Sequence, residues 1–252
     1  VSVDGGTIKL DGNYPVGTSN VALGDTALDS LGSGNYNTAV GHHALTANTD
    51  GGSNTGLGFK ALFANTTGSS NTSVGTNSLD ANTTGANNTA MGQSALGTNT
   101  TASNNTAVGY QSLVANTTGV GNVAVGKGAL DANTTANYNT AVGLDALGTN
   151  TTGTNNNAFG ETALFSNTTG GNNQAVGRGA LESNTTVSNN SAFGHHALKA
   201  NTTGANNTAL GANSLVSNTT ASDNTAVGSV ALYYNTTGSE NVALGRSALA
   251  AN

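Results

Sequence analysis

The chain has 252 residues and a formal net charge of −6, with 7% charged and 4% aromatic residues. Asn, Thr and Gly make up 115 of the 252 residues, so large apolar side chains are too few to fill an ordinary globular core. The lack of cysteine excludes disulfides and thiolate metal sites, no apolar run reaches the ~20 residues of a membrane span, and six dispersed basic residues argue against nucleic-acid binding.

Residues 1–19 differ from the rest of the chain. They contain the single proline, Pro15, and two short strand-like runs. We interpret residues 1–19 as an N-terminal segment that leads into, or caps, the part that follows.

From Asn20 onward the sequence repeats every 17 residues. A glycine recurs at this spacing fourteen times, from Gly24 to Gly245, without an insertion or deletion. The consensus N-T-A-V-G-x-x-A-L-x-x-N-T-T-G-x-x gives thirteen full units and a partial one in residues 20–252. The unit is too short for the helix pairs of α-solenoids, and its Gly, Asn and Thr disfavour helix. The repeat therefore predicts an all-β fold, a parallel β-solenoid (β-roll) of about fourteen 17-residue coils.

Two positions of each unit carry large apolar residues. The residue before the recurring Gly is large and apolar in all fourteen units, and the fourth residue after it is always Leu. Side chains alternate between the two faces of a strand, and we expect both rows to face inward, the Leu row from a second strand. The predicted core comprises Val40, Leu45, Val74, Leu79, Val108, Leu113, Val125, Leu130, Val142, Leu147, Val176, Leu181, Val227 and Leu232.

The residue between Thr and Val points outward if Val points inward. It is Ala in twelve of fourteen units, although variable positions of the same chain accept Asp, Lys, Tyr, His and Arg. An outward row kept this small predicts another backbone close by. We therefore expect a homotrimer of parallel rods with Ala107, Ala124 and Ala141 at its seam. The competing explanation is that the coil bends so that Ala faces its own interior.

Polar positions are equally regular. One Asn opens each unit from Asn20 to Asn241, and a second Asn row runs from Asn48 to Asn252. Stacked Asn amides can hydrogen-bond along a column, so we expect two Asn ladders. The recurring Gly predicts a positive φ or a close backbone approach at a corner. Charged residues occupy variable positions only, which is typical of a solvated surface.

The repeat also resembles known surface fibres. The run N-[TS]-[AV]-[VL]-G-x-x-A resembles the head repeats of trimeric autotransporter adhesins, and N-T-A-x-G-x-x-A-L-x-x-N-T-T-G units are similar to repetitive shafts of phage tail-fibre proteins and bacterial surface proteins. The resemblance covers residues 20–252, with a 17-residue unit in place of the shorter adhesin unit. It implies a left-handed β-roll, three chains side by side, a location on a virion tail fibre or a bacterial cell surface, and a role in host attachment. It implies no catalytic residue and no cofactor.

Two histidine pairs are the candidates for a metal or anion site. His42-His43 and His195-His196 both follow the recurring Gly, nine units apart. In a trimer each pair would form a belt of six imidazoles, which suits a metal or an anion. The simpler interpretation, which we favour, is two polar residues at positions that also accept Gln, Tyr and Arg.

The Asn-Thr-Thr triplets suggest two further hypotheses. Eleven triplets match the N-glycosylation sequon, but they stack too closely for a glycan on every coil, and an Asn ladder explains their period better. Regular Thr also suggests ice binding, for which only one Thr rank of a strand can face out. Calcium-binding nonapeptides are missing and acidic residues are scattered, so we expect no catalytic constellation.

The sequence therefore predicts a non-enzymatic structural protein. We expect an extracellular fibre shaft or adhesin stalk that projects a receptor-binding tip, with a host cell-surface receptor or glycan as a possible partner beside the homotrimer. The alternative is a binding module that uses its own flank for a cell-surface glycan or for ice.

Overall fold

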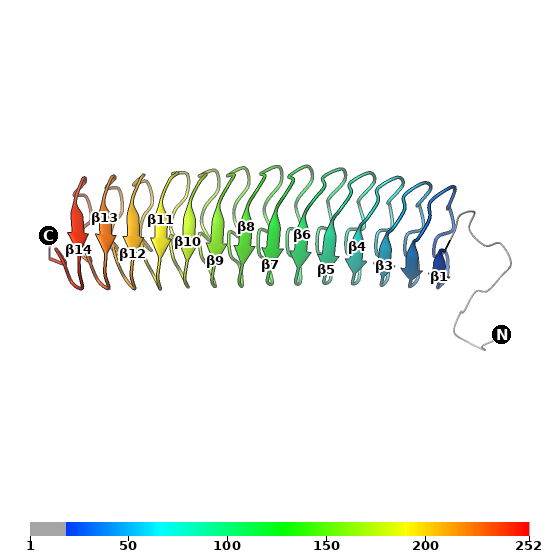
Figure 1. The fold of residues 1–252 in the computed structure, drawn as a ribbon, viewed down its shortest axis with the longest axis horizontal. Helices are drawn as coiled ribbons and strands as arrows, with labels where there is room; N and C mark the ends of the chain where they lie inside the picture. The colour runs from blue at the N-terminus through cyan, green and yellow to red at the C-terminus, as the bar shows by residue number, and fades with distance from the viewer. Residues whose placement is uncertain (1–18, 252) are drawn as a thin grey trace. The chain divides into compact units, whose positions relative to one another are not determined.

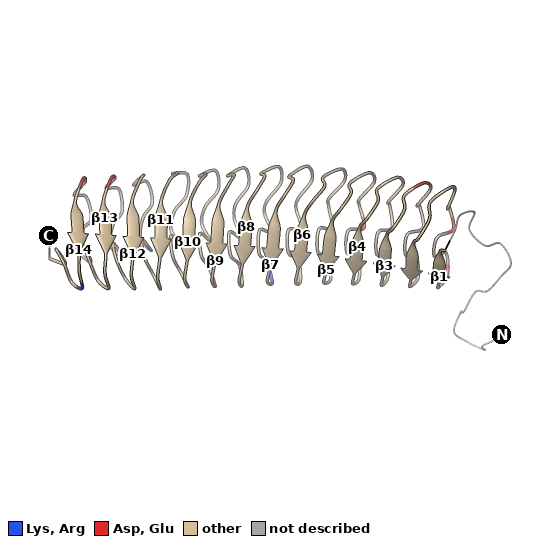
Figure 2. Cartoon of the chain, viewed as in Figure 1, with Lys and Arg blue, Asp and Glu red and all other residues tan. Residues whose placement is uncertain are grey.

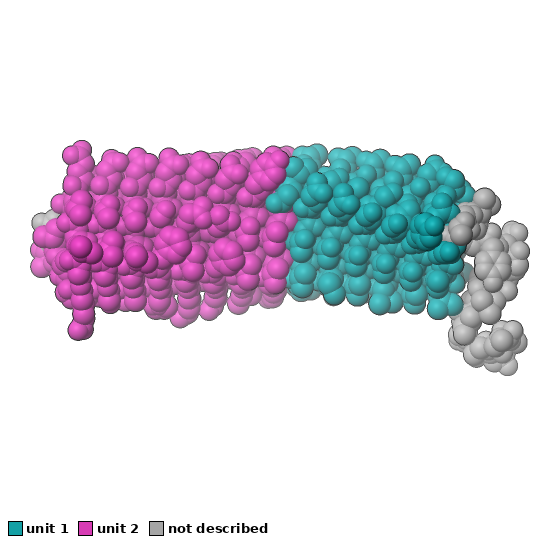
Figure 3. Space-filling model, in the orientation of Figure 1, with its two compact units in different colours: residues 1–121 teal, residues 122–252 magenta. Residues whose placement is uncertain are grey.

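The computed structural model describes residues 19–251, and β-strand is the regular structure found there. The chain divides into two compact units, Val1–Gly121 and Asn122–Asn252 (Figure 3). The predicted N-terminal segment, residues 1–19, lies outside the described residues except for Ser19, as does Asn252. The described part of the chain contains no helix that could cross a bilayer.

Each coil contributes one three-residue strand, and successive strands of a unit pair in parallel and in chain order (Figure 1). Within a unit, residues of neighbouring strands pair with partners 17 positions apart, as Thr89 does with Thr106. The first unit contains β1 (Val21–Leu23), β2 (Thr38–Val40), β3 (Thr55–Leu57), β4 (Thr72–Val74), β5 (Thr89–Met91) and β6 (Thr106–Val108). The second contains β7 (Val123–Val125), β8 (Thr140–Val142), β9 (Asn157–Phe159), β10 (Gln174–Val176), β11 (Ser191–Phe193), β12 (Thr208–Leu210), β13 (Thr225–Val227) and β14 (Val242–Leu244). The predicted all-β parallel solenoid with 17-residue coils is confirmed.

The inner face of each strand carries the alanine row, not the Val row. In β8, Ala141 is fully buried, whereas Thr140 and Val142 on either side are half-buried. The expected inward position of the Val row is therefore wrong. It fails at Val40, Val74, Val108, Val125, Val142, Val176 and Val227, which are half-buried or exposed on the outer face of their strands.

The expected outer seam is wrong for the same reason. Ala107, Ala124 and Ala141 are each fully buried inside their own coil. The competing explanation, in which Ala faces its own interior, is the one the structure supports.

The coil is thin, and this explains why the small middle residue of each strand, and not its larger neighbour, faces inward. In the coil of β4, Ser73 takes the place of the strand Ala and Ser78 the place of the Ala before Leu, and the two hydroxyls hydrogen-bond across the interior. Ser73 also donates a hydrogen bond to the backbone O of Ser78 at 2.7 Å. A Cβ added to Gly56, in the same row as Ser73, would lie 3.2 Å from the backbone O of Ala61 and 3.3 Å from Cδ1 of Leu45. The backbone that keeps this row small is therefore the opposite wall of the same coil.

The Leu row is the large apolar part of the core, as predicted. Leu45, Leu79, Leu113, Leu130, Leu147, Leu181 and Leu232 are all fully buried. They do not lie on a second strand, because every Leu of this row occupies a turn, with a left-handed φ of 50° to 55°. That conformation costs roughly 1–2 kcal/mol per residue, which the ~1.5–3 kcal/mol from burying a Leu side chain offsets.

The recurring glycine after each strand meets both predicted requirements. Gly92 has φ of 134°, and a Cβ added to it would lie 2.4 Å from the backbone O of Gly109 in the next coil. A side chain is thus excluded both by the backbone conformation and by the neighbouring coil.

The two Asn ladders are confirmed, and they belong to the core. Asn65 donates from Nδ2 to Oδ1 of Asn48 at 2.7 Å and to the backbone O of Gly68 at 2.9 Å. Asn54 donates from Nδ2 to the same carbonyl at 2.8 Å, and its backbone N–H bonds Oδ1 of Asn37 at 2.9 Å. Among the described residues, no buried side-chain nitrogen or oxygen lacks a hydrogen-bond partner. Buried amides therefore take the place of the large apolar side chains that the composition lacks.

Candidate functional surfaces

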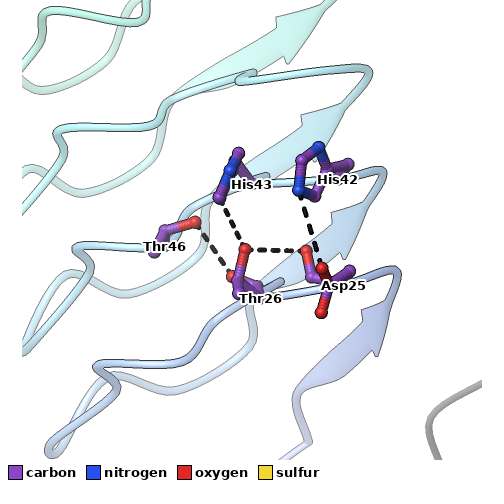
Figure 4. Close-up of polar contacts among 5 residues, drawn as sticks. All are labelled: Asp25, Thr26, His42, His43 and Thr46. Atoms are coloured by element: carbon purple, nitrogen blue, oxygen red, sulfur yellow. Dashed lines mark hydrogen bonds and ion pairs between the residues drawn. The ribbon is translucent and has the colours of Figure 1, made fainter.

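The first histidine pair lies on the turn after β2 (Figure 4). The rings of His42 and His43 stack with their centroids 3.8 Å apart. Nε2 of His42 lies 3.7 Å from Oδ2 of Asp25 in the preceding coil. Nδ1 of His43 lies 2.6 Å from Oγ1 of Thr26, whose hydroxyl donates to the backbone O of Asp25 at 2.8 Å. The two bonds of Thr26 are compatible when His43 carries its proton on Nδ1.

Aromatic and basic side chains from the next coil surround this pair. The ring of His42 lies 5.6 Å from that of Phe59, and the ring of His43 lies 5.7 Å from that of Phe63. Nζ of Lys60 lies 5.5 Å and 5.3 Å from the same two phenyl rings, within cation–π distance. The charged side chains of this cluster, Asp25 and Lys60, therefore lie beside its own histidine and phenylalanine rings.

The second histidine pair repeats the stacking in a different charge environment. The rings of His195 and His196 lie 3.7 Å apart. Burial lowers the pKa of His196, and the neighbouring His195 adds to this effect. Nearby, Arg178 pairs with Glu161 at 3.1 Å; such exposed ion pairs contribute little to stability.

Neither pair builds a metal site within one chain. In residues 19–251 no three His, Cys, Asp or Glu side chains come together in a way that could hold a metal ion. His42 and His43 have the carboxylate of Asp25 beside only one of them, whereas protein zinc sites use three or four protein ligands. The belt of six imidazoles stays the alternative hypothesis, beside the favoured interpretation of two polar turn residues.

The Asn-Thr-Thr sequons are closed to modification in the folded chain. Asn99 is fully buried. Its Nδ2 donates to Oδ1 of Asn82 at 2.9 Å and to the backbone O of Ala102 at 3.0 Å. Because both amide protons are used inside the coil, a glycan on this nitrogen is incompatible with the fold.

The outer side of the strands is a regular surface. We define the outer strand face as the first and third residues of β1 to β14. The first residue is most often Thr, and the third is always Val, Leu, Met or Phe. Leu57, Met91 and Leu210 expose 46%, 44% and 49% of their surface. The structure therefore displays a row that sequence reasoning had placed inside.

Charge is excluded from this face. No first or third strand residue is charged, and Figure 2 shows the few charged residues on the turns while the strands carry none. The sequence does contain a signal for this face, because the middle residue of each strand is always small. A row of Ala, Gly and Ser fits the inside of a thin coil, and this leaves the larger residues outside.

Comparisons with known proteins identify no relative: the chain matches no protein-family model, no curated protein and no solved structure.

Proposed function

We propose that this chain is a structural shaft, a fibre segment or adhesin stalk that spaces a receptor-binding tip from its anchor on a phage tail or a bacterial surface. In this proposal it is extracellular, acts as a homotrimer and catalyses no reaction. A host cell-surface receptor or glycan contacts the tip.

The observation that carries the proposal is the equivalence of successive coils. Within each unit, the bonds that join a coil to the next recur with a sequence separation of 17, as in Asn71 with Asn54 and Asn88 with Asn71. A coil can therefore be added or removed without creating a new kind of interior contact. This property suits a spacer whose length is set by coil number, and the resemblance to tail-fibre and adhesin repeats supports the same role.

A coil-deletion series tests the shaft. Removing residues 54–104, three whole coils, joins Ser53 to Asn105 in the native register. We expect a folded protein whose longest dimension, measured by small-angle scattering, is about 14 Å shorter, because neighbouring strands lie about 4.8 Å apart. Removing residues 56–105 instead joins Thr55 to Thr106, which adds one residue within the strand, turns Ala107 away from the inner face and should unfold the adjoining coils. An unchanged dimension, or equal stability of the two deletions, would contradict the proposal.

One observation favours the alternative of ice binding. Thr38, Thr55, Thr72, Thr89 and Thr106 form an outward rank on five consecutive strands. The neighbouring row is uneven, since it includes Leu57 and Met91. Thermal hysteresis of the purified chain would support this alternative, and the shaft proposal expects none.

A further inference from the structure

The outer strand face changes its composition at three neighbouring strands of the second unit, β9, β10 and β11 (Figure 1). In the other strands its first residue is Thr or Val, but here it is Asn157, Gln174 and Ser191. Among the third residues of β1 to β14, phenylalanine occurs at Phe159 and Phe193 alone. Both rows therefore depart from the repeat in the same three coils. Neither departure is needed to form a coil, because the other coils form without it.

Two phenyl rings of this patch face outward. Phe159 and Phe193 expose 41% and 40% of their surface, and Val176 lies between them in the same row of paired residues. Because parallel strands lie about 4.8 Å apart, the two Phe residues are about 10 Å apart along the sheet. The smaller Val leaves both rings raised above the row. The patch therefore offers two aromatic contact surfaces, spaced by two coils.

Two side-chain amides lie in the row beside the rings. Nδ2 of Asn157 donates a hydrogen bond to Oε1 of Gln174 at 2.7 Å. That bond uses one proton of Asn157, and it involves neither the carbonyl oxygen of Asn157 nor the NH₂ group of Gln174. Both residues are half-buried, so the strands hold them in place. A hydrogen-bond acceptor and donors thus lie close together, which suits a ligand with neighbouring hydroxyl groups.

The patch is uncharged, and the charged residues on the turns next to it neutralise each other. Glu161 and Arg178 each lie two residues beyond the strand, and Oε2 of Glu161 is 3.1 Å from Nε of Arg178. An ionised ligand would meet no excess of opposite charge on this pair. The charge of the patch therefore matches a neutral ligand.

We infer that Asn157, Phe159, Gln174, Ser191 and Phe193 form a binding site for a neutral, linear polysaccharide that crosses β9, β10 and β11 from coil to coil. A pyranose has an apolar C–H face and a rim of hydroxyl groups, so its face packs on a phenyl ring while its hydroxyls bond the amides. In an extended β-1,4-linked chain every second sugar presents the same face, which suits two rings spaced by two coils. The site goes beyond the proposed shaft, in which a glycan contacts only the tip.

Calorimetric titration of the full chain with soluble hexasaccharides tests the ligand. We expect binding of cellohexaose or chitohexaose, which are neutral and β-1,4-linked, and the N-acetyl groups of chitohexaose distinguish the two sugars. Maltohexaose, whose α-1,4-linked chain is curved, should not bind, because it cannot reach both rings. Absence of binding by both β-1,4-linked probes would overturn the inference, as would equal binding of maltohexaose.

Replacement of the two rings tests the site. Phe159→Val combined with Phe193→Val introduces the residue that Val142 and Val176 already provide in this row, so the β content by circular dichroism should be unchanged. We expect the affinity to fall about tenfold or more. The matched control, Phe165→Val, removes a ring that is 36% exposed on the turn after β9, and should bind like the wild type. Unchanged affinity of the double variant, or an equal loss in the control, would overturn the site.

A second variant tests the amides while the rings stay in place. Asn157→Thr combined with Gln174→Thr restores the residue found at this position in β8 and β12. The affinity should fall, although less than in the variant without the rings, because hydrogen bonds of the sugar hydroxyls are lost and the stacking remains. Unchanged affinity would refute the role of the amides.

The coil-deletion series separates this inference from the shaft. Removal of residues 54–104 takes coils from the first unit only, so the shortened chain should bind the hexasaccharide as the full chain does. A chain that shortens as expected but binds no hexasaccharide refutes the polysaccharide site and leaves the shaft intact. A chain that binds but does not shorten refutes the shaft and leaves the site intact.

Discussion

At the scale of single residues, the fold depends on buried amides as much as on apolar contacts. Asn99 donates both protons of Nδ2 and also accepts a bond at Oδ1 from Asn116 at 2.9 Å. Each such residue links three consecutive coils through one side chain. A substitution that keeps the shape of the Asn side chain but removes its two amide protons isolates this contribution.

Asn99→Asp places a carboxylate opposite two acceptors, Oδ1 of Asn82 and the backbone O of Ala102. We expect the free energy of unfolding to fall by about 2–4 kcal/mol at neutral pH. The loss should shrink in acid, where the introduced carboxyl group is protonated and again has a proton to donate. Asn104→Asp, at an exposed position, is the control and should change stability little. Equal losses in denaturant unfolding would show that the ladder does not hold the coils together.

Glycine substitutions separate the two kinds of glycine in a coil. Gly92→Ala forces a side chain into φ of 134° and within 2.4 Å of a backbone oxygen, so we expect a loss of about 3 kcal/mol or more. Gly97→Ala meets its nearest atom at 3.3 Å, at a position without a left-handed φ, and should be nearly neutral. Thermal unfolding of the two variants measures the difference, and a tolerated Gly92→Ala would contradict the close stacking of coils.

Two aspartates should give pH dependences of opposite sign. Burial raises the pKa of Asp80, so its contribution to stability is present in acid and is lost as pH rises through the folded pKa. A hydrogen bond from Ser33 lowers the pKa of Asp50, so its contribution is present at neutral pH and is lost in acid. Calorimetry from about pH 3 to about pH 7 should therefore show that Asp80→Asn raises the neutral-pH melting temperature and Asp50→Asn lowers it. The same sign for both variants would refute these assignments.

At the scale of the coil, the sequence predicts the 17-residue period but not which strand residues face inward. The spacing of Gly and Leu predicts the 17-residue coil and its buried Leu row, and both are present. The rule that large residues face inward fails at Val108 beside Ala107, because the opposite wall of the coil is too close for Val. The sequence also does not predict that Leu113 lies in a turn. A Leu with a left-handed φ is rare, and only burial against the neighbouring coils makes it favourable.

The unequal depth of two apolar residues in one coil is testable. Leu113 is fully buried, and Leu113→Ala should cost about 2–5 kcal/mol. Val108 in the same coil is only half-buried, and Val108→Ala should cost about 1 kcal/mol or less in the single chain. Urea unfolding of the wild type and of both variants measures the two losses. Similar losses at the two positions would place Val108 in the core after all.

At the scale of the whole molecule, the coil interior and the outer strand face differ in composition. Amides, Leu and small residues hold successive coils together inside each unit, while the Thr and apolar rows of the strands face outward. The histidine pairs and the charged residues lie on turns and bends, outside the buried rows of the coil. In the proposed shaft, the turn residues can therefore vary while the buried rows keep the 17-residue coil.

The central claim is that alanine lines the interior and valine the outside. The most direct test is thermal unfolding of Ala141→Leu and Val142→Leu, which place the same side chain on opposite faces of β8. We predict that Ala141→Leu overpacks its coil and loses about 3 kcal/mol or more, with a fall of several degrees in melting temperature. Val142→Leu should unfold like the wild type, because Leu57 and Leu210 already occupy that row. An unchanged melting temperature for Ala141→Leu would contradict the account.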